Sequence, residues 1–119
     1  MTVLMLGKHL ELGLYRAEYL RGKGHNVIFP ESMPEAVAAI NAAVYDVVVL
    51  SYSLSHESAM ELRELIDQSC PQCPVITLTE QPWPDQKIQS DKTVLVSEGP
   101  EALLNAIEDM QQKGLRRVK

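Results

Sequence analysis

The stretch YDVVVLSYSLS, from Tyr45 to Ser55, decides the fold. Its centre, VVVL, is a continuous apolar run without alternation, which is typical of a strand buried on both faces of a parallel sheet. The run leads directly into a segment rich in hydroxyl groups. Many α/β proteins place a reactive carboxylate at such a strand end, whereas this chain places Ser51 there. In open parallel sheets the functional crevice lies at the carboxyl ends of the strands, so this segment is a candidate site wall.

Similar apolar runs recur along the chain and alternate with helical patterns. We expect strands over Val3–Leu6, Asn26–Phe29, Val47–Leu50, Val75–Leu78 and Thr93–Val96. Short connections between alternating strands and helices favour right-handed crossovers and a parallel sheet covered on both faces. The predicted fold class is α/β: a doubly wound, five-stranded parallel sheet of order 2-1-3-4-5, in a flavodoxin-like three-layer sandwich.

Helical periodicity and capping residues place the helices. We expect them over Leu10–Lys23, Pro34–Val44 and Glu57–Ser69, with a last helix starting near Pro100. Gly24 suits the position after the first helix, and Ser32 suits the N-cap of the second. The segment EQPWPDQKIQSDK, which begins at Glu80, contains two prolines. A proline removes a backbone donor and clashes with the preceding turn, so the fourth helix is expected to be short or missing.

Length and composition indicate one ordinary globular domain, 1–119. Apolar residues make up 45% and charged residues 23% of the 119 residues. The formal net charge of −5 argues against bulk attraction to nucleic acid or to an anionic membrane. No apolar run approaches the roughly 20 residues needed to span a bilayer. The N-terminus shows no signal-peptide pattern, so a cytoplasmic location is expected.

The two cysteines form a Cys-x-x-Cys pattern, Cys70 to Cys73, with a proline after each. In thioredoxin-like proteins this motif follows a strand and opens a helix, where the helix dipole lowers the thiol pKa. Here the motif follows a helix and precedes a strand, at the end of the sheet away from the crevice. We therefore expect a proline-rich turn with two separate thiols. Two cysteines do not complete a tetrahedral zinc site unless two copies combine in a dimer.

The chain resembles a response-regulator receiver (CheY-like) domain over nearly its whole length. TVLMLGKHLELGLYRAEYLRGKGHNVIFPES resembles the first strand, first helix and second strand of that family. YDVVVLSYSLS resembles the third strand, which usually reads Asp-Leu-Val-Leu-Leu-Asp-Leu-Met-Leu-Pro. CPVITLTE resembles the fourth strand with its closing Thr, and VLVSEGPEALLNAI resembles the fifth strand and the start of the last helix.

The resemblance implies a phosphoryl-transfer pocket, but most of its residues differ here. Receivers use an Asp nucleophile, two acidic residues that hold Mg²⁺, a Thr or Ser, and a Lys. The nucleophile position aligns with Ser51 and the acidic pair with Gly7 and Lys8, whereas Thr79 matches its counterpart. The Lys position falls at Val96 or Ser97. We interpret Gly7, Lys8, Ser51, Thr79 and Ser97 as a degenerate phosphorylation pocket, and expect no metal and no cofactor.

Lys8 is the most informative difference, because an ammonium group would repel a divalent cation. Its expected ion-pair partner is Glu31 or Glu80. Two interpretations stay open: Lys8 replaces the metal and locks one conformation, or it reflects drift in an exposed loop after phosphorylation was lost.

The sequence therefore predicts a stand-alone pseudo-receiver in two-component or phosphorelay signal transduction. It would bind a protein partner, such as a kinase, regulator or effector, independently of phosphorylation, and a homodimer is an alternative assembly. The candidate partner surface comprises Tyr52, Trp83 and Glu98. Trp83 either anchors an interface or fills the gap left by the shortened helix. Tyr52 either forms a rim contact or packs over the crevice.

The alternative to protein binding is a small-ligand or anion sensor, whose polar mouth would consist of Lys8, Ser51, Ser53, Thr79 and Ser97. An enzyme is not expected, because a serine hydroxyl is inert without an adjacent base. A hydrolase elbow would read Gly-x-Ser-x-Gly, whereas the chain reads VLSYS around Ser51.

Overall fold

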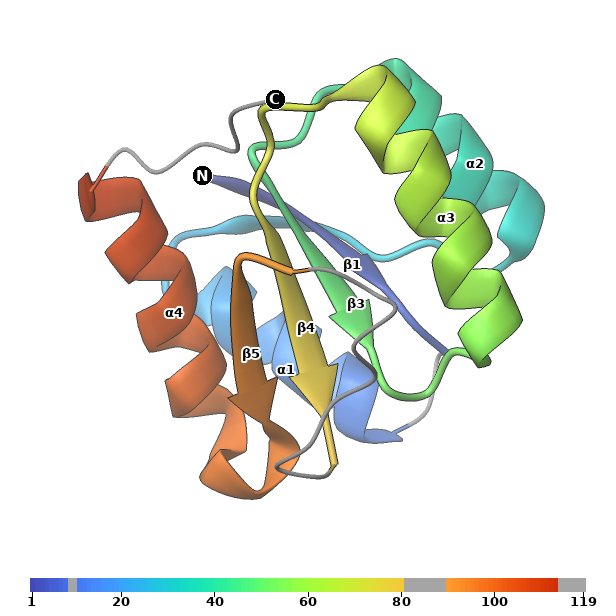
Figure 1. The fold of residues 1–119 in the computed structure, drawn as a ribbon. Coiled ribbons are helices and arrows are strands. Elements are labelled where there is room, and N and C mark those ends of the chain that lie inside the picture. The colour runs from blue at the N-terminus through green and yellow to red at the C-terminus, as the bar shows by residue number, and fades with distance from the viewer. Residues whose placement is uncertain (9–10, 81–89, 114–119) are drawn as a thin grey trace.

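The structure, a computed structural model, describes residues 1–8, 11–80 and 90–113. Five strands and four α-helices alternate along these residues (Figure 1). In chain order they are β1 (Thr2–Leu6), α1 (Glu11–Gly22), β2 (Asn26–Ile28), α2 (Met33–Ala42), β3 (Val47–Ser51), α3 (His56–Ser69), β4 (Val75–Thr79), β5 (Lys92–Leu95), the short 3₁₀ helix η1 (Val96–Glu98) and α4 (Gly99–Lys113).

The strands form one parallel sheet in the order β2-β1-β3-β4-β5, as the sequence predicted (Figure 1). The pairing of β1 with β3 ends at Leu6 and Leu50, which are register partners. The pairing of β4 with β5 ends at Thr79 and Leu95. Because β1 and β3 end at the same level, the residues that follow Leu6 lie beside the last residue of β3.

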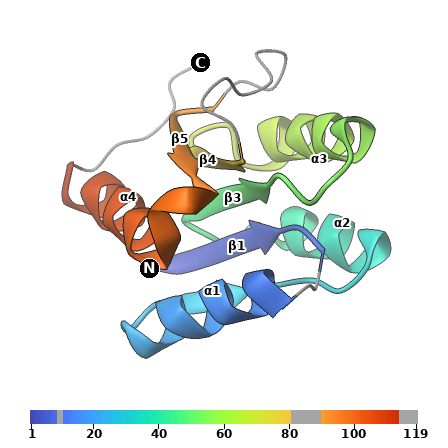
Figure 2. The ribbon, with the colours of Figure 1, turned by 90° about the horizontal axis from the view of Figure 1, so that it is seen from below.

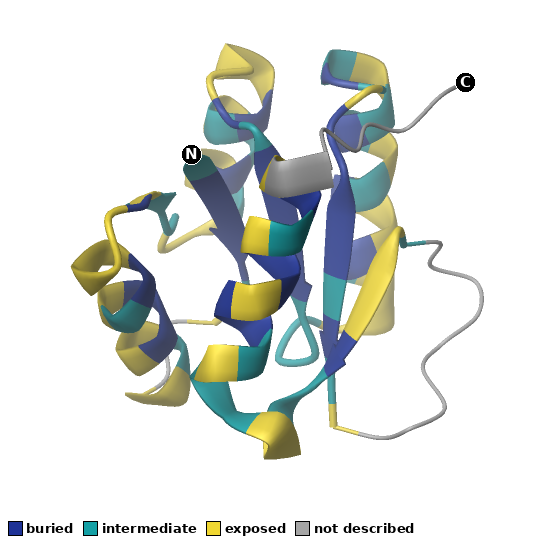
Figure 3. Cartoon of the chain, turned by 90° about the vertical axis from the view of Figure 1, so that its left-hand side faces the viewer, coloured by how far each residue is buried: buried dark blue, intermediate teal, exposed yellow. Residues whose placement is uncertain are grey.

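Residues of each strand alternate between the two faces of the sheet. On β1, Val3 and Met5 pack into the core beneath α1 and α4, whereas Leu4 and Leu6 pack into the core beneath α2 and α3. Figure 2 shows the resulting three layers, with the sheet between the two helix pairs. The inner strands β1, β3 and β4 are largely buried, the edge strands β2 and β5 are partly exposed, and the outer helix faces are exposed (Figure 3). Two cores on either side of one sheet thus hold the carboxyl edge in place.

The end of α1 confirms the role expected of Gly24. Gly24 has a φ of 93° and its N–H donates to the Arg21 carbonyl oxygen at 3.1 Å. The N–H of His25 donates to the Leu20 carbonyl oxygen at 3.2 Å. This pair of bonds is the Schellman motif, which favours glycine because its left-handed position suits a residue without Cβ.

The start of α2 was predicted correctly and its end was not. The Ser32 hydroxyl accepts a hydrogen bond from the Glu35 N–H at 3.3 Å, as expected of an N-cap. The helix ends at Ala42, and Ala43 then adopts a left-handed φ of 53°. Val44, expected on the apolar face of this helix, lies beyond it and is 65% exposed.

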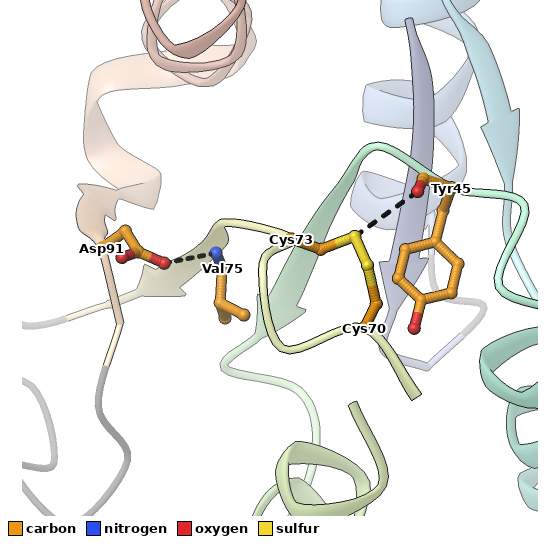
Figure 4. Close-up of a disulfide and its surroundings, with 5 residues drawn as sticks. All are labelled: Tyr45, Cys70, Cys73, Val75 and Asp91. Atoms are coloured by element: carbon orange, nitrogen blue, oxygen red, sulfur yellow. Dashed lines mark hydrogen bonds between the residues drawn. A yellow bond between two sulfur atoms is a disulfide. The ribbon is translucent and has the colours of Figure 1, made fainter. Parts of the chain in front are cut away.

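The prediction of two separate thiols was wrong, because Cys70 and Cys73 form a disulfide (Figure 4). It closes the turn between α3 and β4, at the end of the sheet away from the crevice. The Cys73 Sγ lies 3.6 Å from the Tyr45 carbonyl oxygen. A disulfide sulfur carries no hydrogen, so this contact becomes a hydrogen bond only in the thiol form. Nearby, the Asp91 carboxylate accepts from the Val75 N–H at 2.7 Å and joins the start of β4 to β5.

The fourth helix of the expected pattern falls within residues 81–89, which lie outside the described residues, so its shortness stays a prediction. β5 ends at Leu95, one residue earlier than expected, because Val96 begins η1. None of the helices in residues 1–8, 11–80 and 90–113 has both the length and the apolar character needed to cross a bilayer.

Candidate functional site

The carboxyl ends of β1 and β3 approach closely at Gly7 and Ser51. A Cβ atom built on Gly7 would lie 2.7 Å from the Ser51 Cβ and 2.9 Å from the Ser53 Oγ. Both distances are shorter than real Cβ contacts, so a side chain at position 7 would require the neighbouring loop to shift. Gly7 is therefore required by close backbone approach and not by an unusual turn.

Three hydrogen bonds fix the two strand ends, two within the loop after β3 and one between that loop and the loop after β1. The Ser51 hydroxyl oxygen accepts from the Ser53 N–H at 3.2 Å and from the Ser53 hydroxyl at 3.1 Å. The Ser53 oxygen in turn accepts from the Lys8 N–H at 2.9 Å. The loop after β1 is thus tied to the loop after β3 through one serine side chain. Ser51 is already engaged by its own loop.

The Lys8 side chain is exposed, and the expected ion pairs are absent from the described residues. Neither Glu31 nor Glu80 forms one with it there. Lys8 and Glu31 nevertheless line the same cavity, of about 190 Å³, between the β1 and β2 ends and the start of α2 and α3. Lys8 also lines a second cavity on the other side of the β1 end. Lys8 therefore borders both cavities.

The second cavity has a volume of about 160 Å³ and lies between α1 and the ends of β1 and β3. Sequence reasoning found Tyr52 and the serines of this cavity but missed Arg16 and Phe29. Arg16 is only 7% exposed, and its guanidinium carbon lies 5.8 Å from the centre of the Tyr52 ring. The missed signal was a charged residue at helical spacing from Ala17 and Leu20, on the inward face of α1.

The five predicted pocket residues do not all line one cavity. Gly7, Lys8 and Ser51 lie together around the 160 Å³ cavity. Thr79 is the last residue of β4, and Ser97 is exposed in η1. Neither of them lines either of the two cavities described above. The described geometry thus places the polar mouth on the β1–β3 side of the edge.

The three candidate partner residues have different surroundings. Tyr52 is half-buried and packs against the core beneath α1 and α4, which favours the packing interpretation over a simple rim contact. Glu98 is exposed, and its carboxylate accepts from the Leu95 N–H at 3.4 Å at the start of η1. Trp83 lies outside the described residues.

No protein-family model matches this sequence, and no curated protein is similar to it. Solved structures do match. The Francisella response regulator 1452 receiver domain is 17% identical, with a TM-score of 0.79 over 95% of this chain and 98% of that one. A two-component response regulator from Clostridium difficile is 19% identical, with a TM-score of 0.78 over 94% and 96%. The receiver domain of sensor histidine kinase PA1611 from Pseudomonas aeruginosa is 14% identical, with a TM-score of 0.77 over 91% and 94%.

The chain has the receiver-domain fold. At these identities the likeness concerns the fold alone, and the chemistry of the site follows from the residues present in it. The PA1611 receiver structure has a magnesium ion coordinated in its active-site cleft. Magnesium is held through carboxylate oxygens, and the loop after β1 here offers Gly7 and the ammonium of Lys8 instead. The residues present at the ends of β1 and β3 therefore do not fit a magnesium site of that kind. No group of three or more metal-ligating side chains occurs in residues 1–8, 11–80 and 90–113.

Proposed function

We propose that this protein is a receiver-like domain of two-component signal transduction that binds a protein partner without being phosphorylated on aspartate. The observation that carries the proposal is the end of β3, where Ser51 stands beside Gly7 and Lys8. Acyl-phosphate chemistry needs a carboxylate nucleophile and charge neutralisation by a metal ion. A hydroxyl already hydrogen-bonded to Ser53, facing a glycine and a lysine, supplies neither.

The tight approach of Gly7 to Ser51 further supports a pocket that no longer exchanges phosphate. An acidic side chain at position 7 would collide with the β3 loop, because even a Cβ comes within 2.7 Å of Ser51. The conformation of this edge is set by its own contacts, chiefly the bonds through Ser53. A partner would then recognise one fixed surface.

In this proposal the partner contacts the edge formed by β5 and η1. This edge exposes four polar residues: Lys92, Thr93, Ser97 and Glu98. β5 is the last strand of the sheet, so its outer side carries backbone groups without a neighbouring strand among the described residues. The partner is a kinase, regulator or effector of the same pathway, and a second copy of this chain is the alternative occupant.

The phosphorylation-independent part of the proposal is tested with small phosphodonors. After incubation with acetyl phosphate and Mg²⁺, we expect the intact mass at neutral pH to stay that of the unmodified chain. Titration with beryllofluoride and Mg²⁺ should leave the fluorescence of the single tryptophan, Trp83, unchanged. A saturable change that requires Mg²⁺ in either experiment would overturn the proposal.

The binding part is tested with an identified partner. Once a partner has been isolated, its affinity should be the same with and without beryllofluoride and Mg²⁺. Lys92→Glu should weaken binding, whereas Lys23→Glu, which makes the same charge change beside α1, should not. Equal effects of the two variants would place the partner elsewhere and refute the β5–η1 surface.

A sensor of small ligands is the second candidate function. The observation that favours it is the 160 Å³ cavity at the carboxyl edge, which combines apolar walls with basic and hydroxyl side chains. Ligand pockets in doubly wound proteins occur at this edge of the sheet.

A further inference from the structure

Arg16 is a buried cation that has no ion-pair partner among the described residues. It is only 7% exposed, although an arginine side chain stays charged at all ordinary pH values. Ion pairs in the described residues involve Arg21 and Arg63, but none involves Arg16. A buried charge is costly unless it is paired or hydrogen-bonded. The face of Tyr52 compensates part of this cost through a cation–π contact at 5.8 Å.

The cavity beside Arg16 has the composition of a site for an amphipathic anion. Its apolar walls include Phe29, Leu12 and the ring of Tyr52, and Lys8 adds a second cation at one side. One carboxylate, Glu11, also lines the cavity, but this residue is exposed. The cavity thus presents a buried arginine, next to apolar surface, to a bound ligand.

Glycine at two positions keeps this space open. A Cβ on Gly13 would lie 3.1 Å from the tip of the Phe29 ring and 3.1 Å from the Lys8 carbonyl oxygen. Gly13 therefore allows α1 to approach β2 and the β1 loop closely. Gly7 also lines the cavity, so neither glycine adds a side chain to its lining.

We propose that this cavity binds a small carboxylic acid with a compact apolar body, with Arg16 as the carboxylate ligand. A guanidinium pairs with a carboxylate through two parallel hydrogen bonds, which is the strongest neutralisation available to it. The volume of about 160 Å³ is close to that of cavities that admit a benzene ring. The acid therefore carries one aromatic ring or a short branched chain.

The cavity favours a carboxylic acid over inorganic phosphate. Most of its lining is apolar and would leave several phosphate oxygens without donors, at a cost in desolvation. An apolar body, in contrast, gains from contact with Phe29 and Tyr52.

This inference develops the sensor function and is independent of partner binding at the β5–η1 edge. Occupation of the cavity would fix Tyr52 and the β3 loop against α1. The ligand would thereby act on the same loop that holds Ser51 and Ser53. The test needs neither Mg²⁺ nor a phosphodonor, so its failure would not affect the proposal on phosphorylation, and the reverse also holds.

The test is a titration of the wild-type protein with benzoate, benzyl alcohol and inorganic phosphate, followed by NMR of the backbone amides. Benzyl alcohol has the same ring without the charge. We expect saturable binding of benzoate with shifts at Gly13, Phe29 and Tyr52. Benzyl alcohol should bind about tenfold more weakly or worse, because the charge-assisted pair is lost.

The matched variants are Arg16→Met and Lys23→Met. Each removes one positive charge, but Lys23 lies beyond the end of α1 and does not line the cavity. Arg16→Met keeps an apolar stem and should fold, since it removes a buried charge that has no ion-pair partner among the described residues. It should lose benzoate binding about tenfold or more, whereas Lys23→Met should not.

Three outcomes would overturn the proposal. Benzoate and benzyl alcohol binding equally would show an apolar cavity that does not recognise charge. Phosphate shifting the same amides with equal affinity would show a general anion site. Benzoate shifts confined to other residues would exclude this cavity, and this result comes from the wild-type protein alone, whether or not the variants fold.

Discussion

Gly7 and Ser51 are in such close contact that the end of β1 has no room for a side chain. A Cβ on Gly7 would lie 2.7 Å from the Ser51 Cβ. This relationship links two of the positions at which the chain differs from the pattern expected of a receiver. With serine at the end of β3, its loop folds back through Ser53 and binds the Lys8 N–H. The lack of a side chain at Gly7 and the folded-back loop after Ser51 therefore depend on each other.

Substitution of Gly7 by alanine should destabilise the fold by about 1–3 kcal/mol, the usual cost of forcing extra atoms into a packed site. The matched control is Gly22→Ala at the end of α1, where a Cβ would meet nothing within 4 Å. That change should be neutral or stabilising by up to about 1 kcal/mol, because alanine is the better helix former. Urea unfolding of both variants measures the difference. Equal stabilities would mean that the β1 and β3 ends are not in close contact.

The disulfide between Cys70 and Cys73 should contribute little to stability, because it closes a very short loop. The chain-entropy relation gives roughly 2 kcal/mol for a loop of this length. Dithiothreitol should therefore lower the unfolding free energy of the wild type by about that amount. In the double variant Cys70→Ser/Cys73→Ser, dithiothreitol should have no effect on stability. A wild type that is equally insensitive to the reductant would indicate two thiols in solution, as the sequence first predicted.

Ala43 adopts a left-handed conformation with a φ of 53° at the end of α2. This region costs an L-residue roughly 1–2 kcal/mol, and glycine avoids that cost but loses more entropy on folding. We expect Ala43→Gly to raise the unfolding free energy by about 0.5–1 kcal/mol. Ala42→Gly, one residue earlier and still helical, should lower it by a similar amount. Thermal unfolding measures both, and a destabilised Ala43→Gly would contradict this helix end.

The sheet could be predicted from the sequence because its signal is local and strong. β1 and β3 contain continuous apolar runs, and Val3 with Met5 on one face and Leu4 with Leu6 on the other need helices on both sides. Gly24 ends a helix because it lacks a Cβ, and Ser32 begins one because its hydroxyl caps the first turn. The end of α2 could not be predicted, because Ala43 is an ordinary helix former and its left-handed conformation depends on the chain around it.

The site could be predicted only in part, since much of it depends on distances between elements. Alignment of strand ends placed Gly7, Lys8 and Ser51 together, because parallel strands finish at one edge. The burial of Arg16 arises from the packing of α1 against Tyr52, which lies far away in the sequence. The disulfide was not predicted, because two cysteines do not make a disulfide framework and the placement of the motif argues only against redox catalysis.

The pocket chemistry itself gives the last prediction, which concerns the role of Lys8. Ser51→Asp restores a carboxylate at the end of β3, but the ammonium of Lys8 beside it should continue to exclude Mg²⁺. Ser51→Asp alone should therefore remain unmodified by acetyl phosphate.

Ser51→Asp combined with Lys8→Asp adds a second carboxylate on the loop after β1, where it avoids the crowded position 7. This double variant should gain a Mg²⁺-dependent change in Trp83 fluorescence, because hard cations bind carboxylate oxygens. Lys23→Asp in the Ser51→Asp background makes the same charge change away from the edge and should not respond. If Ser51→Asp alone responds to Mg²⁺, Lys8 is not the barrier to Mg²⁺ binding.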